Sequence, residues 1–412
     1  MRILLVGDYP RDPRLGSTKV FLKLQEEFRA LGHECDVLLA DDLGLRPQHR
    51  LLRWAVEPVA ALAAVRRAFR DRGAYDIVDV ASAEGLWIGA LRRAGSFNGA
   101  AVIARSNGIE HLNYQRMLAD HDDGLSRKPW MRRWFYPAVR LSQVACAARV
   151  ADRLILLNDA DRAFVRSKRW KRDDRIDLVA HGVSSRFLSD VPPPDHPRGR
   201  GILFCGTWDA MKGVHYLARA FSKMVDARLK GSRDLKGSRD DNRLHGDDRS
   251  RDVARGVQPS GPLNLTVLGG GVPAGAIRSA FSDNARPHVT VVDRVSEEEV
   301  IEAYRSHDVM AFPSSYEGFG MVLLEAMSQR LPVVATPVGC ATTLVRDGET
   351  GLTVPPRNPD ALAAALDRTL ADPALRASLA ERAFQRVREM SWTRTARETL
   401  NVYERARNGF AR

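Results

Sequence analysis

The sequence has 412 residues, which is more than one ordinary hydrophobic core accommodates, so its length predicts two domains. Hydrophobic residues make up 44% and charged residues 28%, a composition typical of a soluble globular protein and not of a disordered chain. The net charge of +12 at pH 7 favours anionic partners: phosphate-bearing substrates, an acidic lipid surface or nucleic acid. An arginine-rich composition with no such role explains the charge equally well.

Cysteine usage and the opening residues exclude several other classes. The cysteines show no CxxC spacing and no nearby histidine cluster, which disfavours a disulfide framework or a zinc site and fits a reducing cytosol; they are Cys35, Cys146, Cys205 and Cys340. The chain opens directly into an apolar run, Ile3–Val6, so we expect no signal peptide and a cytoplasmic protein. The longest apolar stretch, near residues 55–65, contains Glu57 and Pro58 and is too short to span a bilayer.

The first half of the chain alternates apolar runs with helical patterns. We predict strands at 3–6, 35–39, 77–80, 101–105 and 153–157. Strands alternating with helices indicate a parallel sheet covered on both faces. Because ligands of such sheets bind at the carboxyl ends of strands, the loops 7–17 and 105–111 are the first candidates for a site.

A basic and aromatic stretch lies between residues 127 and 149. Pro137 interrupts it, so we expect one short helix to end near Tyr136 and a second to continue to about Ala151. Aromatic residues beside Arg and Lys suit an anionic membrane interface or a lipid-phosphate acceptor. An ordinary helix that packs its aromatic side chains inward is the competing interpretation.

A proline-rich segment, 191–197, is interpreted as the linker between two domains. After it, a strand at 201–205 leads into Gly206 and then Lys212 near the start of a helix. A strand, a glycine and a lysine in this order indicate a phosphate site, where Lys212 supplies a mobile positive charge. The alternative is that Lys212 is a solvated surface residue.

The alternation of apolar runs with helical patterns is interrupted between residues 228 and 262, where LKGSRD occurs twice in tandem. No aromatic residue occurs between Phe221 and Phe281, and charges of both signs alternate with Gly and Ser. Such a segment buries too little apolar surface to offset the loss of chain entropy, so we predict a disordered insertion at about 228–262.

The most informative stretch is residues 313–327, PSSYEGFGMVLLEAM. A buried strand at 309–312 precedes it, and apolar residues at helical spacing follow, so we expect a helix to begin near Phe319 or Gly320. A strand, a glycine-bearing loop and a helix N-terminus make an anion site, because free backbone N–H groups and the helix dipole point at the ligand. Glu317 lies in the loop, and Glu325 lies in the second turn of the helix.

This succession, over roughly 289–366, resembles the C-terminal half of the retaining glycosyltransferases of family 4, whose signature is two glutamates with seven residues between them. The resemblance implies an α/β fold of GT-B architecture, with two Rossmann-like, doubly wound domains facing across a cleft. It implies an acceptor-binding domain at 1–190, a donor-binding domain at 198–390, and a final helix at 391–412 that packs back on the first domain. The activity it implies is transfer of a sugar from a nucleoside-diphosphate sugar to an acceptor hydroxyl, with retention of configuration and with neither metal nor cofactor.

The same resemblance suggests roles for individual residues. Glu317 and Asn107 are the expected catalytic residues, with Glu317 over the transferred sugar. The expected donor-binding residues, with Glu325 on the ribose hydroxyls, are Gly16, Gly206, Lys212, Gly318, Phe319, Gly320, Met321 and Glu325. For Gly16, a plain helix start capped by Ser17 or Thr18 is the alternative.

Two positions depart from the family pattern. Many members have a histidine at the position of Asn107, and asparagine can donate a hydrogen bond to a sugar but cannot titrate. Many have an arginine at the position of Thr207, so one cation near the diphosphate is missing. His111 could substitute for the absent histidine, but a loop histidine of this kind more often serves packing.

The family's habits and the basic composition suggest a cell-envelope polysaccharide or a lipid-linked glycan as acceptor, with peripheral association at the anionic inner face of the plasma membrane. The departures at Asn107 and Thr207 keep open a degenerate member that binds nucleotide or a partner without catalysis. A nucleic-acid-binding protein is a further alternative, but the mixed charge of residues 229–255 and the lack of any nucleic-acid motif argue against it.

Overall fold

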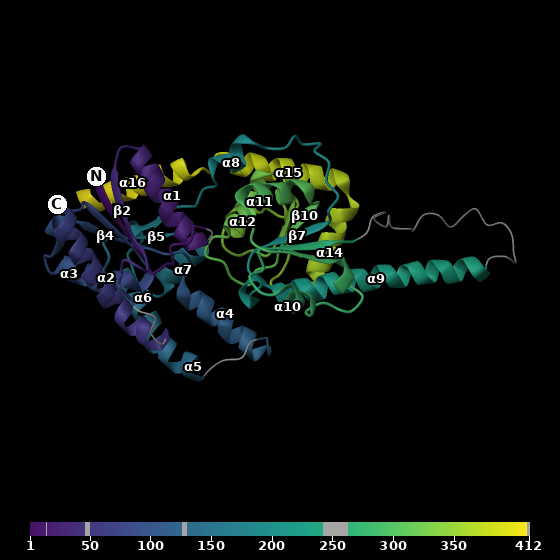
Figure 1. Ribbon diagram of the computed structural model, residues 1–412, viewed down its shortest axis with the longest axis horizontal. Helices are drawn as coiled ribbons and strands as arrows, with labels where there is room; N and C mark the ends of the chain where they lie inside the picture. The colour runs from purple at the N-terminus through teal and green to yellow at the C-terminus, as the bar shows by residue number, and fades with distance from the viewer. Residues whose placement is uncertain (14, 46–49, 126–129, 242–262, 410–412) are drawn as a thin grey trace. The chain divides into compact units, whose positions relative to one another are not determined.

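The computed structural model describes the chain except for residues 14, 46–49, 126–129, 242–262 and 410–412 (Figure 1). The described residues form two compact units. The first comprises Met1–Ser185, Tyr316–Met321 and Glu389–Arg412, and the second comprises Arg186–Ser315 and Val322–Arg388. Each unit contains one six-stranded sheet in the part of the chain that is described.

The sheet of the first unit is entirely parallel and has the order β2-β1-β3-β4-β5-β6. Its strands are β1 (Arg2–Val6), β2 (Glu34–Leu38), β3 (Ile77–Ala81), β4 (Ala101–Arg105), β5 (Arg153–Leu156) and β6 (Ile176–Leu178). The chain crosses from β2 on one side of β1 to β3 on the other, so the topological switch point lies between β1 and β3. Ligands of such sheets bind at this point, beyond the carboxyl ends of the strands.

Helices cover both faces of this sheet, because successive strand residues point to opposite sides and both sides are apolar. One core joins Leu4, Val78 and Val102 to α2, α3 and α6, and the other joins Ile3, Ile77 and Ile103 to α1 and α16 (Figure 1). The helices of this unit are α1 (Gly16–Ala30), α2 (Arg50–Arg72), η1 (Ser82–Glu84), α3 (Gly85–Arg93), η2 (Phe97–Gly99), α4 (Glu110–Asp122), α5 (Trp130–Tyr136), η3 (Pro137–Leu141), α6 (Ser142–Val150), α7 (Asp159–Ser167), η4 (Asp173–Arg175) and α16 (Trp392–Asn408).

The sheet of the second unit has the order β12-β11-β10-β7-β8-β9 and is also parallel. Its strands are β7 (Ile202–Cys205), β8 (Leu265–Leu268), β9 (Val289–Val292), β10 (Val309–Phe312), β11 (Val333–Ala335) and β12 (Leu352–Thr353). The first three strands run outward from β7 and the last three run outward from β10 on the other side. This is the Rossmann strand order, with its switch point between β7 and β10.

Local sequence signals set the ends of several helices here. Ser296 and Glu299 form the reciprocal capping box of α11, and Asn358 caps α14, which has Pro359 at its first position. The helices are α8 (Ser185–Ser189), η5 (Ala210–Lys212), α9 (Val214–Asp241), α10 (Ala274–Arg278), η6 (Arg286–His288), α11 (Glu297–Ser306), α12 (Met321–Ser328), α13 (Ala341–Leu344), α14 (Pro359–Ala371) and α15 (Pro373–Val387). The predicted fold class, two doubly wound parallel sheets, is confirmed.

The last helix, α16, is part of the core of the first unit. Its apolar face contributes Trp392, Val402 and Tyr403 to the cluster that contains Phe28 of α1. The Tyr403 hydroxyl donates to Asp79 Oδ2 at 2.5 Å, and Arg105 Nη2 donates to the same oxygen at 2.6 Å. Strands β3 and β4 and the sequence-distant helix α16 are thus joined through the buried carboxylate of Asp79.

Residues 228–241 differ from the expectation of a disordered insertion at about 228–262, because they continue helix α9 to Asp241 (Figure 1). The first turns of α9 are anchored in the core by Leu217, Phe221 and Val225. Once such a helix is nucleated, each further residue adds a hydrogen bond at little cost, and no proline interrupts residues 214–241. Residues 242–262 lie outside the described part of the chain.

The division between the units falls at Ser185, before the proline-rich segment that the sequence indicated as the linker. Polar side chains of the second unit hold the intervening residues. Gln329 Nε2 donates to the Phe187 carbonyl at 2.8 Å, and Arg330 Nη1 donates to the Pro192 carbonyl at 2.8 Å. Strands β6 and β12, which the sequence analysis missed, are short edge strands of three and two residues.

Candidate functional site

The loops that follow β7 and β10 meet at the switch point of the second sheet. The backbone N–H of Ser315, after β10, donates to the carbonyl of Met211, after β7, at 2.8 Å. The hydroxyl of Thr336, after β11, donates to the Ser314 carbonyl at 2.6 Å. Three neighbouring strand ends are therefore tied together where a doubly wound sheet binds its ligand.

Lys212 lies in the first of these loops, at the end of η5, and Gly213 separates it from α9. The Asp209 side chain caps the turn by accepting from Met211 N at 2.8 Å. Gly213 follows in a left-handed conformation, with φ of 70°. A Cβ at Gly213 would lie 1.9 Å from the Pro313 carbonyl oxygen, so only glycine permits this approach of the two loops.

Gly206 and Thr207 open the same loop directly after β7, and Thr207 is exposed. The structure thus brings Gly206 and Lys212, both predicted donor-binding residues, into one loop beside the residues that end β10. Their contact with a diphosphate stays a prediction.

Helix α12 begins at Met321, one or two residues later than expected. Glu325 lies in it with 8% of its surface exposed, and the Tyr304 hydroxyl donates to Glu325 Oε2 at 3.2 Å. Burial, followed by the charges of Cys205 and Glu325, raises the pKa of Tyr304, so its hydroxyl stays a proton donor to Glu325. This bond fixes the carboxylate, while its role toward a ribose stays a prediction.

Residues 316–321, which contain the other predicted glutamate, belong to the first unit. The Tyr316 hydroxyl donates to the Ile109 carbonyl at 3.0 Å, and Asn158 Nδ2 donates to the Gly318 carbonyl at 2.9 Å. Glu317, between these anchored residues, has 6% of its surface exposed. The loop that carries the proposed catalytic carboxylate is therefore held from both sides.

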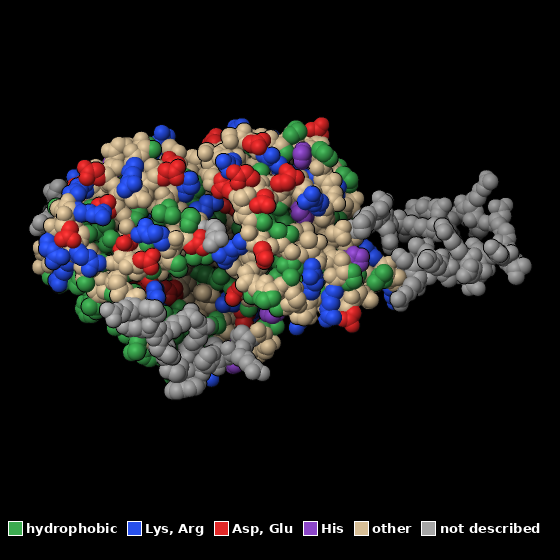
Figure 2. Space-filling view, in the orientation of Figure 1, with side chains coloured by type: hydrophobic (Ala, Val, Ile, Leu, Met, Phe, Trp, Pro, Cys, Tyr) green, Lys and Arg blue, Asp and Glu red, His purple; other side chains and the backbone are tan. Residues whose placement is uncertain are grey.

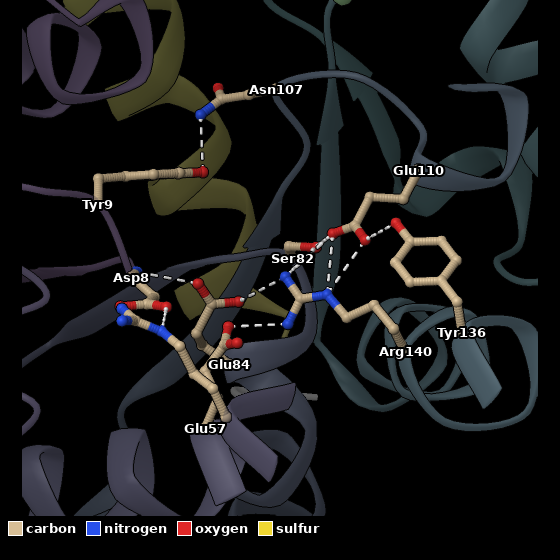
Figure 3. Close-up of polar contacts among 10 residues, drawn as sticks. Asp8, Tyr9, Glu57, Ser82, Glu84, Asn107, Glu110, Tyr136 and Arg140 are labelled. Atoms are coloured by element: carbon tan, nitrogen blue, oxygen red, sulfur yellow. Dashed lines mark hydrogen bonds and ion pairs between the residues drawn. The ribbon is translucent and has the colours of Figure 1, made fainter. Parts of the chain in front are cut away.

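Gly318 allows the closest approach in this loop. A Cβ at Gly318 would lie 1.9 Å from the backbone oxygen of Asn107, which is too close for any other residue without a shift of one backbone. The side-chain Nδ2 of Asn107 donates to the Tyr9 hydroxyl at 3.0 Å (Figure 3). Within the described residues, Asn107 Oδ1 is buried and has no hydrogen-bond partner. The two predicted catalytic residues, Glu317 and Asn107, thus lie on loops in direct contact.

The remaining predicted residues of the first unit have varied surroundings. Gly16 begins α1 and is exposed, and neither Ser17 nor Thr18 caps this helix, because both lie inside it. Phe319 is buried and packs edge-on against His181, with ring centroids 5.0 Å apart. The ring of His111 packs against Trp170 at 4.6 Å, and burial lowers its pKa to about 4, which supports the packing interpretation of this histidine.

The sequence analysis missed a charged cavity of about 450 Å³ in the first unit (Figure 3). It is lined by Asp8, Tyr9, Arg53, Trp54, Glu57, Ser82, Glu84, Glu110 and Arg140. Asp8 and Tyr9 follow β1, and Ser82 and Glu84 follow β3, so their place beyond strand ends was a usable signal. Arg140 comes from the π-helical turn η3 after Pro137, and its arrival at this cavity had no signal in the sequence.

The described residues contain neither a metal-binding cluster nor a membrane-spanning helix. No cluster of three or more histidine, cysteine, aspartate or glutamate side chains is arranged to hold a metal ion in the part of the chain that is described. Among the same residues, no helix is both long enough and apolar enough to cross a bilayer.

Solved structures share this architecture along almost the whole chain. A sucrose-phosphate synthase from Thermosynechococcus elongatus matches with a TM-score of 0.72 and 21% identity, covering 98% of each chain. The HepE protein of Anabaena in complex with UDP-glucose matches with a TM-score of 0.62 and 14% identity, covering 100% of this chain and 99% of that chain. Identities this low establish the fold alone, and that fold is the GT-B architecture.

The sequence comparisons match part of the chain to one family model and to named relatives. Residues 252–386 match the model of the family described as glycosyl transferases group 1. A D-inositol 3-phosphate glycosyltransferase of a Nocardioides species is 45% identical over 287 residues, which is 66% of this chain and 57% of that protein. A protein of the same name from Kineococcus radiotolerans is 32% identical over 295 residues, with 66% and 61% coverage. The chain therefore spans about three fifths of the length of these relatives. The match of residues 252–386 to the group 1 family model agrees with the resemblance.

Proposed function

We propose that this protein transfers a sugar from a nucleoside-diphosphate sugar to an acceptor hydroxyl, with retention of anomeric configuration and without a metal ion. The observation that carries the proposal is the junction of the loops after β7 and β10, with Ser315 N bonded to Met211 O at 2.8 Å, at the switch point of a Rossmann-ordered sheet. The group 1 match and the UDP-glucose complex of the HepE protein support this choice of donor.

In this reaction, negative charge develops on the departing diphosphate. Lys212 and the backbone amides after Glu317 stabilise that charge. Glu317 contacts hydroxyls of the transferred sugar and favours positive charge at its anomeric carbon, while Glu325 contacts the ribose of the donor. Asn107 donates a hydrogen bond to the sugar where a titrating histidine is absent. Of the other residues assigned to the donor, Gly16 and the stretch Gly318–Met321 contribute backbone near the diphosphate.

The acceptor is a cell-envelope polysaccharide or a lipid-linked glycan. Exposed residues of α5 support work at an anionic membrane surface on the cytoplasmic side, since Arg133 is exposed and the Trp134 side chain is 70% exposed. Adjacent exposed arginine and tryptophan side chains favour an interface between apolar and anionic surroundings.

The test is release of nucleoside diphosphate from a panel of uridine, guanosine and adenosine diphosphate sugars incubated with purified protein. We expect one donor to be consumed, slowly with water alone and faster when an envelope glycan fraction is added. Binding of nucleotide without consumption of any donor in the panel would instead support a degenerate, non-catalytic family member.

A further inference from the structure

The charged cavity of the first unit occupies the switch point of its sheet, between β1 and β3. Asp8 and Tyr9 leave the end of β1, and Ser82 and Glu84 leave the end of β3. Its volume of about 450 Å³ accommodates a small ligand or the end of a larger one. Its position and size are those expected of a binding site, and the chemistry of its walls limits what it could bind.

The cavity walls carry more carboxyl groups than guanidinium groups, with Asp8, Glu57, Glu84 and Glu110 against Arg53 and Arg140. Both arginines are already occupied. Arg53 Nε donates to Asp8 Oδ2 at 3.0 Å, and Arg140 Nη1 donates to Glu57 Oε1 at 2.8 Å. Arg140 Nη2 also donates to Glu110 Oε1 at 3.0 Å. A phosphate group here would have to displace carboxylates from both arginines and then face them.

One carboxyl oxygen of Glu84 in this wall has an ion-pair partner but makes no hydrogen bond within the described residues. Its side chain is 2% exposed, and its Oε1 accepts from the backbone N–H of Asp8 at 2.9 Å. Within the described residues, Glu84 Oε2 has no hydrogen-bond partner, and Arg140 Nη2 lies 3.8 Å away. Figure 3 shows the carboxyl groups of Glu57 and Glu84 side by side, turned toward Arg140. A buried acceptor without a donor is costly, so a ligand that brings a hydroxyl or ammonium hydrogen is favoured.

The pKa shifts of Glu57 and Glu84 agree with this geometry. Burial, and next the charge of Glu57, raises the pKa of Glu84, and burial also raises the pKa of Glu57. Burial alone would raise the pKa of Glu110 too, but Arg140 and the hydroxyls of Ser82 and Tyr136 lower it. These shifts favour the ionised form of Glu110 beside Arg140, while Glu57 and Glu84 form a neighbouring pair that resists further negative charge.

We propose that this cavity binds the hydroxyl-rich, unphosphorylated end of the acceptor, a neutral or amino polyol whose hydrogens reach Glu84 and Glu57, and that it excludes phosphate. Its assignment as the acceptor end rests on the proposed function. The relatives named D-inositol 3-phosphate glycosyltransferases carry a phosphorylated polyol in their name, so the proposal separates this chain from them in acceptor choice.

The test is direct binding of three probes to the full chain by calorimetry, without donor: myo-inositol, D-glucosamine and D-inositol 3-phosphate. We expect the phosphorylated probe to bind at least about tenfold more weakly than the better of the other two, which is roughly 1.4 kcal/mol. Equal or tighter binding of the phosphorylated probe overturns the proposal. So does the absence of binding by both unphosphorylated probes at millimolar concentrations.

A double variant, Glu57→Gln with Glu84→Gln, keeps the shape of the wall and removes its charge. We expect it to narrow the difference between the probes severalfold, whereas Glu34→Gln, on an exposed pair with Arg2, leaves the difference unchanged. An unchanged difference in the double variant contradicts the electrostatic cause. The comparison of probes on the unaltered protein still decides the proposal if the variant does not fold.

A parallel titration with nucleoside diphosphates separates the two proposals. If a nucleotide binds but the probes do not follow the expected order, the cavity proposal fails alone. If the probes follow the order but no nucleotide binds and no donor is consumed, the transferase proposal fails and the cavity remains a polyol site.

Discussion

At the scale of single residues, Glu317 is deeply buried, and the residues on either side of it hold its loop in place. Tyr316 and Gly318 are both hydrogen-bonded within the first unit, and Glu317 itself is 6% exposed. A carboxylate positioned this firmly needs little reorganisation when charge develops beside it.

Replacing Glu317 by Gln keeps the size of the side chain and removes its charge. We expect Glu317→Gln to lower sugar transfer by at least about 100-fold while nucleotide affinity changes little, because the charge acts on the transition state. Steady-state transfer rates and calorimetric titration of the nucleoside diphosphate measure the two effects. Glu349→Gln is the matched control, since Glu349 is an exposed glutamate paired with Arg346. Full transfer activity in Glu317→Gln would remove the proposed catalytic role.

We expect Asp161 to make the stability of the protein depend on pH. It is 1% exposed, its Oδ2 has no hydrogen-bond partner within the described residues, and burial raises its pKa from 3.8 to about 7. Between about pH 4 and pH 7 the folded state holds a proton here that the unfolded state releases, so stability falls as pH rises through this window.

Asp161→Asn removes this dependence. We expect the variant to gain on the order of 1–3 kcal/mol relative to the unaltered protein when the pH rises from 5 to 8. Denaturant unfolding at the two pH values measures the gain. Asp159→Asn, which changes an exposed carboxylate of the same helix, should show no such change. A difference between Asp161→Asn and the unaltered protein that stays constant from pH 5 to pH 8 would show that Asp161 titrates normally.

At the scale of elements, α16 is attached through a polar contact inside an apolar cluster. Asp79, Arg105 and Tyr403 are all fully buried, and both partners donate to the same Asp79 oxygen. Buried ion pairs tolerate the loss of a partner poorly, because the remaining charge is left unsolvated. The third member, the hydroxyl of Tyr403, is the one that can be removed without leaving a bare charge.

The substitution Tyr403→Phe therefore tests how much this hydrogen bond contributes to the stability of the protein. We expect the free energy of unfolding to fall by about 2 kcal/mol, because the hydroxyl donates to a charged acceptor. Hydrogen exchange of α16 amides should also become faster. Tyr114→Phe, whose hydroxyl makes an exposed bond to the Arg133 carbonyl, should change stability by less than about 0.5 kcal/mol. Equal effects of the two variants would mean that the buried network contributes nothing specific.

The strands and most helices of the core could be predicted because their signals are local. Apolar runs such as 309–312 and the cap at Ser296 need no knowledge of the rest of the chain. The end of α9 could not be predicted, since its charged residues 228–241 continue a helix that the preceding core residues nucleate. Propensity and composition describe a segment in isolation, and here tertiary packing outweighed them.

The candidate site also contains some residues that could be predicted from the sequence and others that could not. Glu317, Gly318 and Lys212 were recognisable because they stand beside a strand end in a familiar order. Asn158 was not, although its side chain bonds Gly318 across 160 positions of sequence. Arg140 was interpreted as part of a surface stretch, yet it is buried among three glutamates. Residues that come together only in the folded chain have no characteristic spacing in the sequence, so their contacts could not be predicted from it.

At the scale of the whole molecule, the charge of +12 is not gathered in one place on the visible face. Figure 2 shows Lys and Arg interspersed with Asp and Glu over that face. Nucleic-acid binding by neutralisation of many phosphates needs basic residues clustered along one surface. The charge distribution on this face therefore does not favour nucleic-acid binding, and the charged cavity of the first unit is lined by more carboxyl than guanidinium groups.

The central claim is that the loop after β7 binds the diphosphate of a donor. Calorimetric titration of uridine, guanosine and adenosine diphosphates into the unaltered protein, Lys212→Ala and Lys223→Ala tests it most directly; Lys223 is an exposed lysine paired with Asp360. We predict that at least one nucleotide binds, that Lys212→Ala weakens it about tenfold or more, roughly 1.4 kcal/mol, and that Lys223→Ala binds as the unaltered protein does. Failure of all three nucleotides to bind, or unchanged affinity in Lys212→Ala, would contradict the account.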